Sequence, residues 1–289
     1  MDFRPAILIT GAGGVVGRFL VPFLAARGVP VVAMLRRPEV QPEIPGVRWL
    51  VARIEDLGDE LKGIRAVVHA AATSPGPGVT ADQIVRDNIE AMRWLVEAAA
   101  AAAVPRFIFL SAVSAYGTVT AHVVDETTPS VDPDLYGLSK RVGEEMLAAY
   151  SGLPSIVLRL PAVVGPGARR NWMARVKDSI LAGGPVEVFN AEAPYNNIVH
   201  LADLAELILG LVLRPLAGHD RVVLGAGGAM PVGEVVRSLM MALGCRVDVR
   251  DVVSDRSSFI IDSTRARNLL GYRPMKIDST IRRFAADPR

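Results

Sequence analysis

The sequence predicts an α/β fold in which helices cover both faces of a doubly wound parallel sheet. Three observations predict it. Short apolar runs alternate with longer helical patterns through the first half of the 289-residue chain. A glycine-rich turn, Thr10 to Gly17, joins the first apolar run to the first helical pattern. Hydrophobic residues make up 51% of the chain, which suits a parallel sheet that is buried on both faces.

The apolar runs are expected to be strands and the amphipathic stretches helices. The expected strands are Ala6 to Ile9, Val31 to Leu35, Val47 to Val51, Ala66 to Val68, Phe107 to Leu110 and Ile156 to Leu160. The expected helices are Val15 to Arg27, Ala81 to Ala103 and Leu135 to Tyr150. Pro22 lies inside the first helix and is expected to kink it or mark its boundary.

The alternation fades after about Gly165, which predicts two domains. We expect a dinucleotide-binding Rossmann domain over residues 1–165, with a returning segment near 195–225. A smaller substrate-binding lobe is expected over residues 166–194 and 226–289.

Composition excludes several classes of function. Lys and Arg number 32 against 30 Asp and Glu, and no long basic run is present, so nucleic acid is not an expected partner. The apolar stretch Leu201 to Leu213 is interrupted by Asp203 and Glu206, which indicates a core helix and no membrane partner. The stretch from Met1 to Pro5 runs straight into the first strand and leaves no room for a signal peptide. Cys245 is the only cysteine. We therefore expect a cytoplasmic protein that binds a small molecule and no metal.

The turn Thr10-Gly11-Ala12-Gly13-Gly14-Val15-Val16-Gly17 predicts a phosphate site. Gly11, Gly14 and Gly17 allow a sharp turn and a close approach of the backbone to a pyrophosphate. The N–H groups at the start of the next helix, at Val15 and Val16, then point at the anion. Because a strand precedes the turn and a helix follows it, a dinucleotide is favoured over a merely structural turn.

The residues that follow the second strand decide between NADP and NAD. A carboxylate at this position binds the ribose hydroxyl of NAD, whereas this chain has Arg36 and Arg37, two cations suited to a 2′-phosphate. The sequence therefore favours NADP(H), with NAD as the alternative. Alternatively, Arg36 and Arg37 are a pair of solvated surface arginines. Glu39 in the following loop is a further candidate to contact a ribose.

Tyr136 and Lys140 are four residues apart, on one face of an expected helix. A cation about 5 Å from a phenol, at an effective dielectric of about 20, stabilises the phenolate by at most about 3 kcal/mol. We therefore expect Lys140 to lower the pKa of Tyr136 towards the range in which it exchanges protons with an alcohol or ketone.

These motifs together resemble the extended short-chain dehydrogenase/reductase family, of the epimerase/dehydratase type. That family contains nucleotide-sugar epimerases, dehydratases and ketoreductases. The resemblance covers Ile7 to about Pro274, nearly the whole chain. The segments that carry it are Thr10 to Gly17, His69 to Ala72, Asn88, Ser111 to Gly117, Tyr136 to Lys140, Leu158 to Leu160, Gly165 to Gly167, His200 to Ala205 and Leu269 to Pro274.

The resemblance implies roles for individual residues. Tyr136 is the implied proton donor and acceptor, and Lys140 holds the nicotinamide ribose. The other implied cofactor contacts are Ile54, Ala70, Ala71, Asn88 and Pro161. The family also implies a homodimer that pairs through the helices at 81–103 and 135–150.

The chain departs from the family pattern at several positions. The catalytic Ser or Thr of the family, four residues before Tyr116, is replaced by Ala112, so Ser111 or Ser114 is expected to substitute. Arg53 stands where an acid near the adenine is expected.

Two further departures affect substrate recognition. Asn196 replaces an arginine that grips the diphosphate of nucleotide sugars, and Ala162 replaces an asparagine. Asn196 is kept as an expected substrate contact, and Arg169 and Arg170 in the loop nearby are expected to supply positive charge to the substrate.

The function favoured by the sequence is hydride transfer between a nicotinamide cofactor and a hydroxyl or keto carbon of a sugar or nucleotide-sugar-like substrate, with Tyr136 as acid and base. An epimerase that retains NAD is the alternative within this class. An alternative from another class is a dinucleotide-binding sensor without catalysis, for which Ala112 is the best argument.

Overall fold

The computed structural model describes residues 6–254 and 258–288. These residues divide into two compact units. The first unit holds the described residues up to Gly117, together with Ser130–Arg159 and Ala205–Val222. The second unit holds Thr118–Pro129, Leu160–Leu204 and the described residues from Val223 onward.

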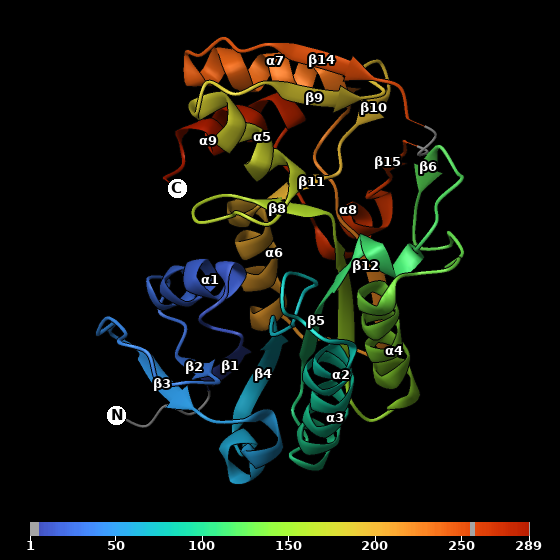
Figure 1. The fold of residues 1–289 in the computed structure, drawn as a ribbon. Coiled ribbons are helices and arrows are strands. Elements are labelled where there is room, and N and C mark those ends of the chain that lie inside the picture. Colours follow the sequence, from blue (N-terminus) through green and yellow to red (C-terminus); the bar gives the residue numbers. More distant parts are fainter. Residues whose placement is uncertain (1–5, 255–257, 289) are drawn as a thin grey trace. The chain divides into compact units, whose positions relative to one another are not determined.

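The first unit carries the central sheet. Within the described ranges, the sheet has seven strands in the order β12-β7-β5-β4-β1-β2-β3 (Figure 1). The strands are β1 (Ala6–Thr10), β2 (Val31–Leu35), β3 (Val47–Val51), β4 (Ile64–His69), β5 (Phe107–Ala112), β7 (Ser155–Leu160) and β12 (His219–Val223). β1 runs parallel to β2 and β4, and the pairs β2–β3 and β4–β5 are parallel too.

The order of the strands reverses beside β1. β2 and β3 follow on one side of β1, whereas β4, β5, β7 and β12 extend the sheet on the other side. In open α/β sheets, ligands bind outside the carboxyl ends of the strands at such a reversal. The predicted doubly wound fold is therefore confirmed, and it directs attention to the residues that follow β1 and β4.

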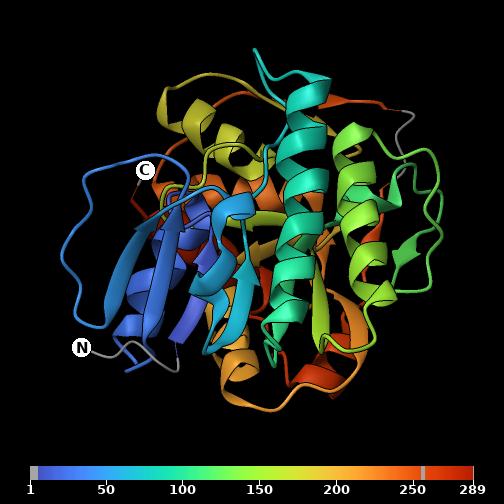
Figure 2. The same ribbon diagram turned by 90° about the horizontal axis from the view of Figure 1, so that it is seen from below.

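Helices cover both faces of this sheet. α3 (Ala91–Ala101) and α4 (Leu135–Ala149) lie side by side (Figure 2). The core beneath them joins helix residues to alternate positions of the strands: Leu8, Val32, Val67, Phe107, Met92, Leu95 and Leu147. Ile7 and Ile9 point to the opposite face and are buried as well. α1 (Val15–Ala25) packs against β1 and β2.

The helix expected over 81–103 is divided in the structure. α2 (Ala81–Ile84) leads into a π-helical segment, Val85–Glu90, before α3 begins. Neither Gly nor Pro occurs in this stretch, so the sequence pattern gave no sign of the change. π-helical turns occur often at functional sites, because the extra residue re-aims the side chains around it. Pro22 lies inside α1 and does not end it.

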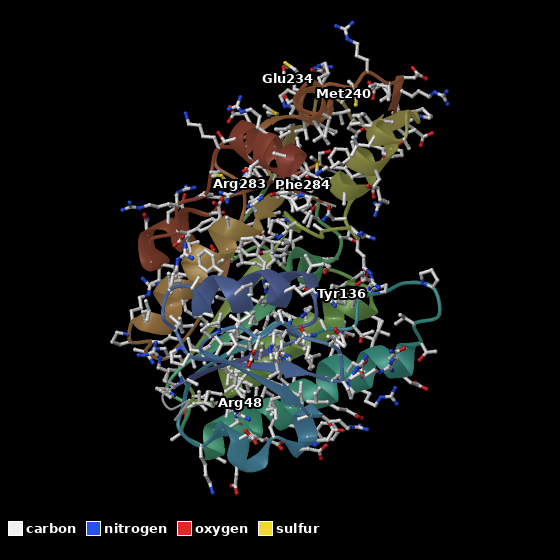
Figure 3. All side chains as sticks on the ribbon, turned by 90° about the vertical axis from the view of Figure 1, so that its left-hand side faces the viewer. Arg48, Tyr136, Glu234, Met240, Arg283 and Phe284 are labelled. Atoms are coloured by element: carbon white, nitrogen blue, oxygen red, sulfur yellow. The ribbon has the colours of Figure 1, made fainter. Side chains whose placement is uncertain are left out.

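Short strand pairs and helices build the second unit. The parallel pairs are β8 (Ala162–Val164) with β11 (Ile198–His200), β9 (Val186–Phe189) with β14 (Val249–Val252), and β6 (Val123–Val124) with β15 (Ile260–Ile261). β10 (Pro194–Tyr195) pairs antiparallel with β13 (Met230–Pro231). The helices are α5 (Trp172–Leu181), α7 (Val232–Leu243), α8 (Thr264–Leu270) and α9 (Ile277–Ala286), and α6 (Leu201–Leu213) begins here and ends in the first unit. Their shared core includes Ile180, Val235, Leu239 and Phe284, the last labelled on α9 in Figure 3.

The boundaries of these units differ from the expected domain limits. Thr118–Pro129 and all of Leu160–Leu204 belong to the second unit, although much of this sequence was expected in the dinucleotide-binding domain. The assignment of one unit to the cofactor and the other to the substrate stays a prediction. Met1 to Pro5, where no signal peptide is expected, lie outside the described residues.

In the part of the chain that the structure describes, no helix has both the length and the apolar character needed to cross a membrane.

Candidate active site

The glycine turn after β1 packs tightly against the end of β4. A Cβ placed on Gly11 would lie 2.7 Å from the backbone of Ala71 and 2.9 Å from that of Ala70. A Cβ on Gly17 would overlap the carbonyl of Gly11. Gly11 also has a φ of +70°, which favours glycine. Larger side chains at these two positions would push apart the turn, the first helix and the end of β4.

The amino end of α1 suits an anion. Gly14 precedes the helix, no side chain caps it, and the first turn holds no acidic residue. The N–H groups of Val15 and Val16 have no acceptor within the helix. The aligned peptide dipoles add partial positive charge at this end. The turn therefore fits the pyrophosphate of a dinucleotide.

Arg36, at the end of β2, is held by a carboxylate. Its Nη1 donates to Oδ2 of Asp87, 2.6 Å away, and Thr73 Oγ1 donates to the same oxygen at 2.6 Å. Burial alone would raise the pKa of Asp87, but the hydrogen bonds from Thr73 and Arg36 hold it below its usual range. The Arg36 guanidinium that was expected to meet a 2′-phosphate thus already has an anionic partner, while Arg37 is exposed.

A second carboxylate lies directly over the glycine turn. The two oxygens of Glu39 are 3.6 and 3.7 Å from the position that a Cβ of Gly13 would take. Arg18 fixes this arrangement, because its Nε donates to the Gly13 carbonyl at 2.7 Å and its Nη2 donates to Glu39 at 3.2 Å. Ile54 follows β3, in a short 3-10 helix, and packs half-buried against the core of the first unit.

Asn88, on the π-helical segment, ties the loop after β4 to α4. Its Oδ1 accepts from Thr73 N at 2.7 Å, and its Nδ2 donates to Thr73 O and to Ser139 Oγ, both at 3.0 Å. Ser139 Oγ in turn donates to the carbonyl of Tyr136 at 2.7 Å. Asn88 is buried, and its amide groups are fully used in holding these two segments together.

Tyr136 lies in the first turn of α4 (Figure 3). Lys140 Nζ is 5.8 Å from the centre of the Tyr136 ring. The phenol forms a hydrogen bond with Ser74, from the loop after β4. Burial raises the pKa of Tyr136, the bond with Ser74 offsets part of this, and Asp134 raises it further. The pKa of Tyr136 is therefore raised in this structure, contrary to the lowering expected from Lys140, because burial is the largest cause of its shift.

Lys140 is buried, and its surroundings make its ammonium form easier to deprotonate. Its Nζ donates to the Leu110 carbonyl at 2.9 Å and lies 4.9 Å from the centre of the Phe109 ring. Burial lowers its pKa to about 8, while the charge of Glu144 raises it. Burial and the Lys140 charge together lower the pKa of His69 to about 3, so His69 is neutral. Lys140 is the cation beside Tyr136.

The two candidate serines have different surroundings. Ser111 is buried, and its hydroxyl donates to Glu144 Oε1 at 2.6 Å. The Ser114 hydroxyl is buried and has no hydrogen-bond partner among the described residues. Ser114 also lies against the start of α4, since a Cβ on Gly137 would overlap its carbonyl. The backbone of Ser114 thus packs against Gly137, the residue that follows Tyr136 in the chain, and its hydroxyl is unused by the described residues.

A comparison with known families assigns the chain to one of them. A model of the NAD dependent epimerase/dehydratase family matches residues 7–225. The chain belongs to this family.

Relatives that align over nearly the whole chain agree with that assignment. UDP-glucose 4-epimerase of Azospirillum brasilense is 26% identical over 96% of this chain and 90% of its own length. dTDP-4-dehydro-6-deoxy-D-allose reductase of Streptomyces bikiniensis is 25% identical over 94% and 92%. The solved structure of MoeE5 in complex with UDP-glucuronic acid and NAD is 27% identical, with a TM-score of 0.83 over 96% of each chain. The predicted enzyme of short-chain dehydrogenase/reductase type, with a nicotinamide dinucleotide cofactor, is confirmed.

The second unit of this epimerase/dehydratase holds the expected substrate contacts. Asn196 is buried, and its side chain donates to Ile261 O and accepts from Ile261 N, both at 2.8 Å. Its amide therefore holds β15 in place. Arg169 and Arg170 are exposed in the loop between β8 and α5, and Arg169 lines a cavity of about 380 Å³. Pro161 is buried between β7 and β8.

Sequence reasoning missed the partners that surround the reactive pair. Ser74 touches Tyr136, and Glu144 accepts from Ser111, Arg159 and Arg221. Glu144 follows Lys140 by one helical turn, so helical spacing was the signal available for it. Ser74 lies in a loop, where no periodicity indicates the direction of a side chain.

Proposed function

We propose that this protein transfers a hydride between a nicotinamide dinucleotide and a hydroxyl-bearing carbon of a nucleotide-sugar-like substrate, with Tyr136 moving the accompanying proton. The observation that carries the proposal is the Tyr136–Lys140 pair, in which Lys140 Nζ lies 5.8 Å from the centre of the Tyr136 ring and bonds the Leu110 carbonyl of β5. The glycine turn after β1 accompanies it. Relatives named as UDP-glucose 4-epimerases and a dTDP-sugar reductase support the substrate class. MoeE5, with its UDP sugar, supports it as well.

The residues that would hold the dinucleotide surround the reversal. The turn Gly11–Gly17 and the N–H groups of Val15 and Val16 suit the pyrophosphate, and Ala70 and Ala71 border the turn. Lys140 would hold the nicotinamide ribose. When bound, the nicotinamide ring supplies the hydride acceptor and donor.

Tyr136 is suited to give a proton. A phenol whose pKa is raised by burial stays protonated at neutral pH. When a substrate ketone is reduced, we propose that the Tyr136 hydroxyl donates its proton to the forming alkoxide. The hydrogen bond from Ser74 orients the phenol, and the Lys140 ammonium stabilises the phenolate that remains.

Ser114 is the better candidate for the hydroxyl that Ala112 lacks. Its buried hydroxyl has no partner among the described residues, so it can donate to the substrate oxygen at no cost to another bond. The hydroxyl of Ser111 is committed to Glu144 at 2.6 Å. We therefore assign the second donor to Ser114 and a structural role to Ser111.

For the adenosine end of the cofactor, the contacts favour NAD over the NADP that the sequence indicated. Glu39, which is paired with exposed Arg18 at 3.2 Å, presents its carboxylate beside Gly13, where it would accept from ribose hydroxyls and disfavour a 2′-phosphate. Arg36 is neutralised by Asp87 at 2.6 Å. Tightly held NAD is the requirement of an epimerase that returns the hydride, so this reaction is our first candidate. In its first half, Tyr136 as the phenolate would take the proton of the substrate hydroxyl, and in its second half the phenol would return that proton.

We also propose a cytoplasmic homodimer that pairs through α3 and α4. Leu138 on α4 is 44% exposed and Val85 on the π-helical segment before α3 is 36% exposed, and the proposed contact would cover both side chains. Sedimentation of the purified protein tests the dimer, and a monomer at micromolar concentration would contradict it.

The test of the function is turnover of UDP-hexoses and dTDP-hexoses by the purified protein, with the copurified dinucleotide identified by mass spectrometry. Tyr136→Phe is expected to lower kcat by about 10²–10⁴ fold, because the proton donor is lost. Tyr150→Phe, at the exposed end of the same helix, is the matched control and is expected to keep full activity. Equal activity of the Tyr136→Phe variant and the parent would refute the proposal.

A further inference from the structure

A buried cluster of charges lies one helical turn beyond Lys140. Glu144 is 1% exposed and accepts from Ser111 Oγ at 2.6 Å. The Glu144 carboxylate also accepts from Arg159 Nη2 at 2.6 Å and Arg159 Nε at 2.9 Å, and from Arg221 Nη1 at 3.0 Å. Arg159, on β7, is 1% exposed as well. A buried ion pair adds little net stability compared with apolar side chains of the same size, so its presence beside the reactive pair calls for another explanation.

The cluster holds the segment that carries Ser114 at both ends. Ser111 binds Glu144 at the start of the segment, and the Arg159 guanidinium lies 4.4 Å from the centre of the Tyr116 ring at its end. The preceding residue, Leu110, accepts from Lys140 Nζ at 2.9 Å. Lys140 and Glu144, two side chains on the same face of α4, therefore form hydrogen bonds with the successive β5 residues Leu110 and Ser111.

We propose that Glu144 is a positioning residue, whose buried negative charge stabilises the Lys140 ammonium and whose bonds to Ser111 and Arg159 fix the strand end that carries Ser114. The proposal rests on the function proposed for Lys140. It concerns a residue that touches neither substrate nor cofactor and acts through its neighbours.

The other groups around Lys140 do not replace this charge. Tyr136 is protonated at neutral pH, and His69 on β4 is neutral, since burial lowers its pKa to about 3. On the π-helical segment, Asn88 carries no charge and Asp87 is turned to Arg36 and Thr73.

The remaining charged groups lie beyond Glu144 or at the surface. Arg159 and Arg221 bind Glu144 itself, and Arg141 on α4 lies 3.9 Å from Glu144 and binds Glu145. The remaining charged residues of the helical segments that pack against α4 are Asp82, Arg86, Glu90, Arg93 and Glu97. All five belong to exposed or half-exposed residues. Glu144 is therefore the buried carboxylate that supports Lys140.

Removal of the Glu144 charge is expected to make Lys140 easier to deprotonate. Burial already lowers the pKa of Lys140 to about 8, and Glu144 opposes this. In Glu144→Gln, the midpoint of Lys140 titration is expected to move down by about one pH unit, allowing for the screening of Glu144 by Arg141, Arg159 and Arg221. The alkaline limb of kcat is expected to move down by the same amount.

The titration of Lys140 can be followed without any turnover. The chain holds four lysines, Lys62, Lys140, Lys177 and Lys276, so NMR of protein labelled at lysine Cε gives few signals. Lys140→Arg assigns the relevant signal. Glu145→Gln is the matched control, because Glu145 is 54% exposed and binds Arg141 at 2.7 Å on the same helix.

The outcomes separate this inference from the proposed function. A downward shift in Glu144→Gln, with none in Glu145→Gln, supports it even if no substrate turns over. An unchanged Lys140 midpoint, or an equal shift in both variants, overturns it. If Glu144→Gln fails to fold, the paired variant Glu144→Gln/Arg159→Gln removes one charge of each sign. A smaller downward shift is expected there, because Glu144 is the charge that acts on Lys140 and loss of the Arg159 cation offsets part of its removal. A normal Lys140 midpoint in that paired variant overturns the inference too.

Discussion

The Arg36 guanidinium and the Asp87 carboxylate lie 2.6 Å apart, and this ion pair joins the end of β2 to the π-helical segment. The same carboxylate oxygen accepts from Thr73 in the loop that carries Ser74. The ion pair therefore connects the adenosine end of the expected cofactor site with the loop that contacts Tyr136. It also leaves the Glu39–Arg18 pair, and not Arg36, as the charged groups beside the glycine turn.

Cofactor choice is expected to depend on Glu39 more than on Arg36. In Glu39→Gln, the affinity for NAD should fall about tenfold, because a charge-assisted hydrogen bond to the ribose is weakened. In Arg36→Ala, the ratio of NAD to NADP affinity should stay within about twofold of the parent. Titration of tryptophan fluorescence with each dinucleotide measures both.

Glu43→Gln, in the same loop and exposed, is the control for a general loss of negative charge. A clear preference of the parent protein for NADP, abolished by Arg36→Ala, would return the assignment to the one that the sequence alone favoured.

Substitution of Gly17 is expected to abolish dinucleotide binding. An added Cβ would overlap the Gly11 carbonyl, so the turn and the start of α1 must separate. We expect Gly17→Ala to weaken NAD binding at least about 100-fold, since the helix N-terminus no longer meets the pyrophosphate. Isothermal titration calorimetry checks this.

Gly210→Ala is the matched control, because Gly210 is an exposed position in α6 where a Cβ would meet no atom within 4 Å. It should bind NAD normally and be more stable by up to about 1 kcal/mol, the helix preference of alanine over glycine. Normal binding by Gly17→Ala would refute the assignment of the turn.

Ser114 and Ser111 are expected to fail in different ways. Ser114→Ala should lower kcat about 100-fold with little change in the free energy of unfolding, because its hydroxyl bonds no described residue. Ser111→Ala should lower the free energy of unfolding by about 1–3 kcal/mol, because buried Glu144 loses a donor. Steady-state kinetics and urea unfolding of both variants distinguish them, and a reversed pattern would show that Ser111 is the donor.

Local patterns predicted the parts of the fold and the site that depend on local physics. The glycine spacing, the buried strands and the Tyr136–Lys140 spacing all follow from periodicity and backbone sterics. What the patterns missed depends on long-range burial. The direction of the Tyr136 pKa shift required the extent of its burial, and the commitment of Ser111 to Glu144 required a contact across 33 residues.

The same limit applies to cofactor choice. Arg36 is separated from Asp87 by 51 residues, and the π-helical segment that aims Asp87 has no signature in its sequence. Arg36 after β2 therefore meets an anion that is a side chain of the protein itself, and the NADP preference expected from Arg36 and Arg37 stays a prediction.

In the second unit, substitution of Asn196 is expected to lower the stability of the protein, whereas substitution of Arg169 is expected to weaken substrate binding. Asn196 makes two 2.8 Å bonds to the backbone of Ile261 and is buried, so Asn196→Ala should lower the free energy of unfolding by about 2–3 kcal/mol. The KM of this variant should stay within about twofold of the parent.

Arg169 is exposed and lines a cavity, where its charge is expected to meet a phosphate of the substrate. Arg169→Ala should therefore raise KM for a nucleotide sugar about tenfold, with unchanged stability. Arg175→Ala, an exposed arginine on α5, controls for the loss of a surface charge. A tenfold rise of KM in Asn196→Ala, with no loss of stability, would return this residue to the substrate contacts that the sequence predicted.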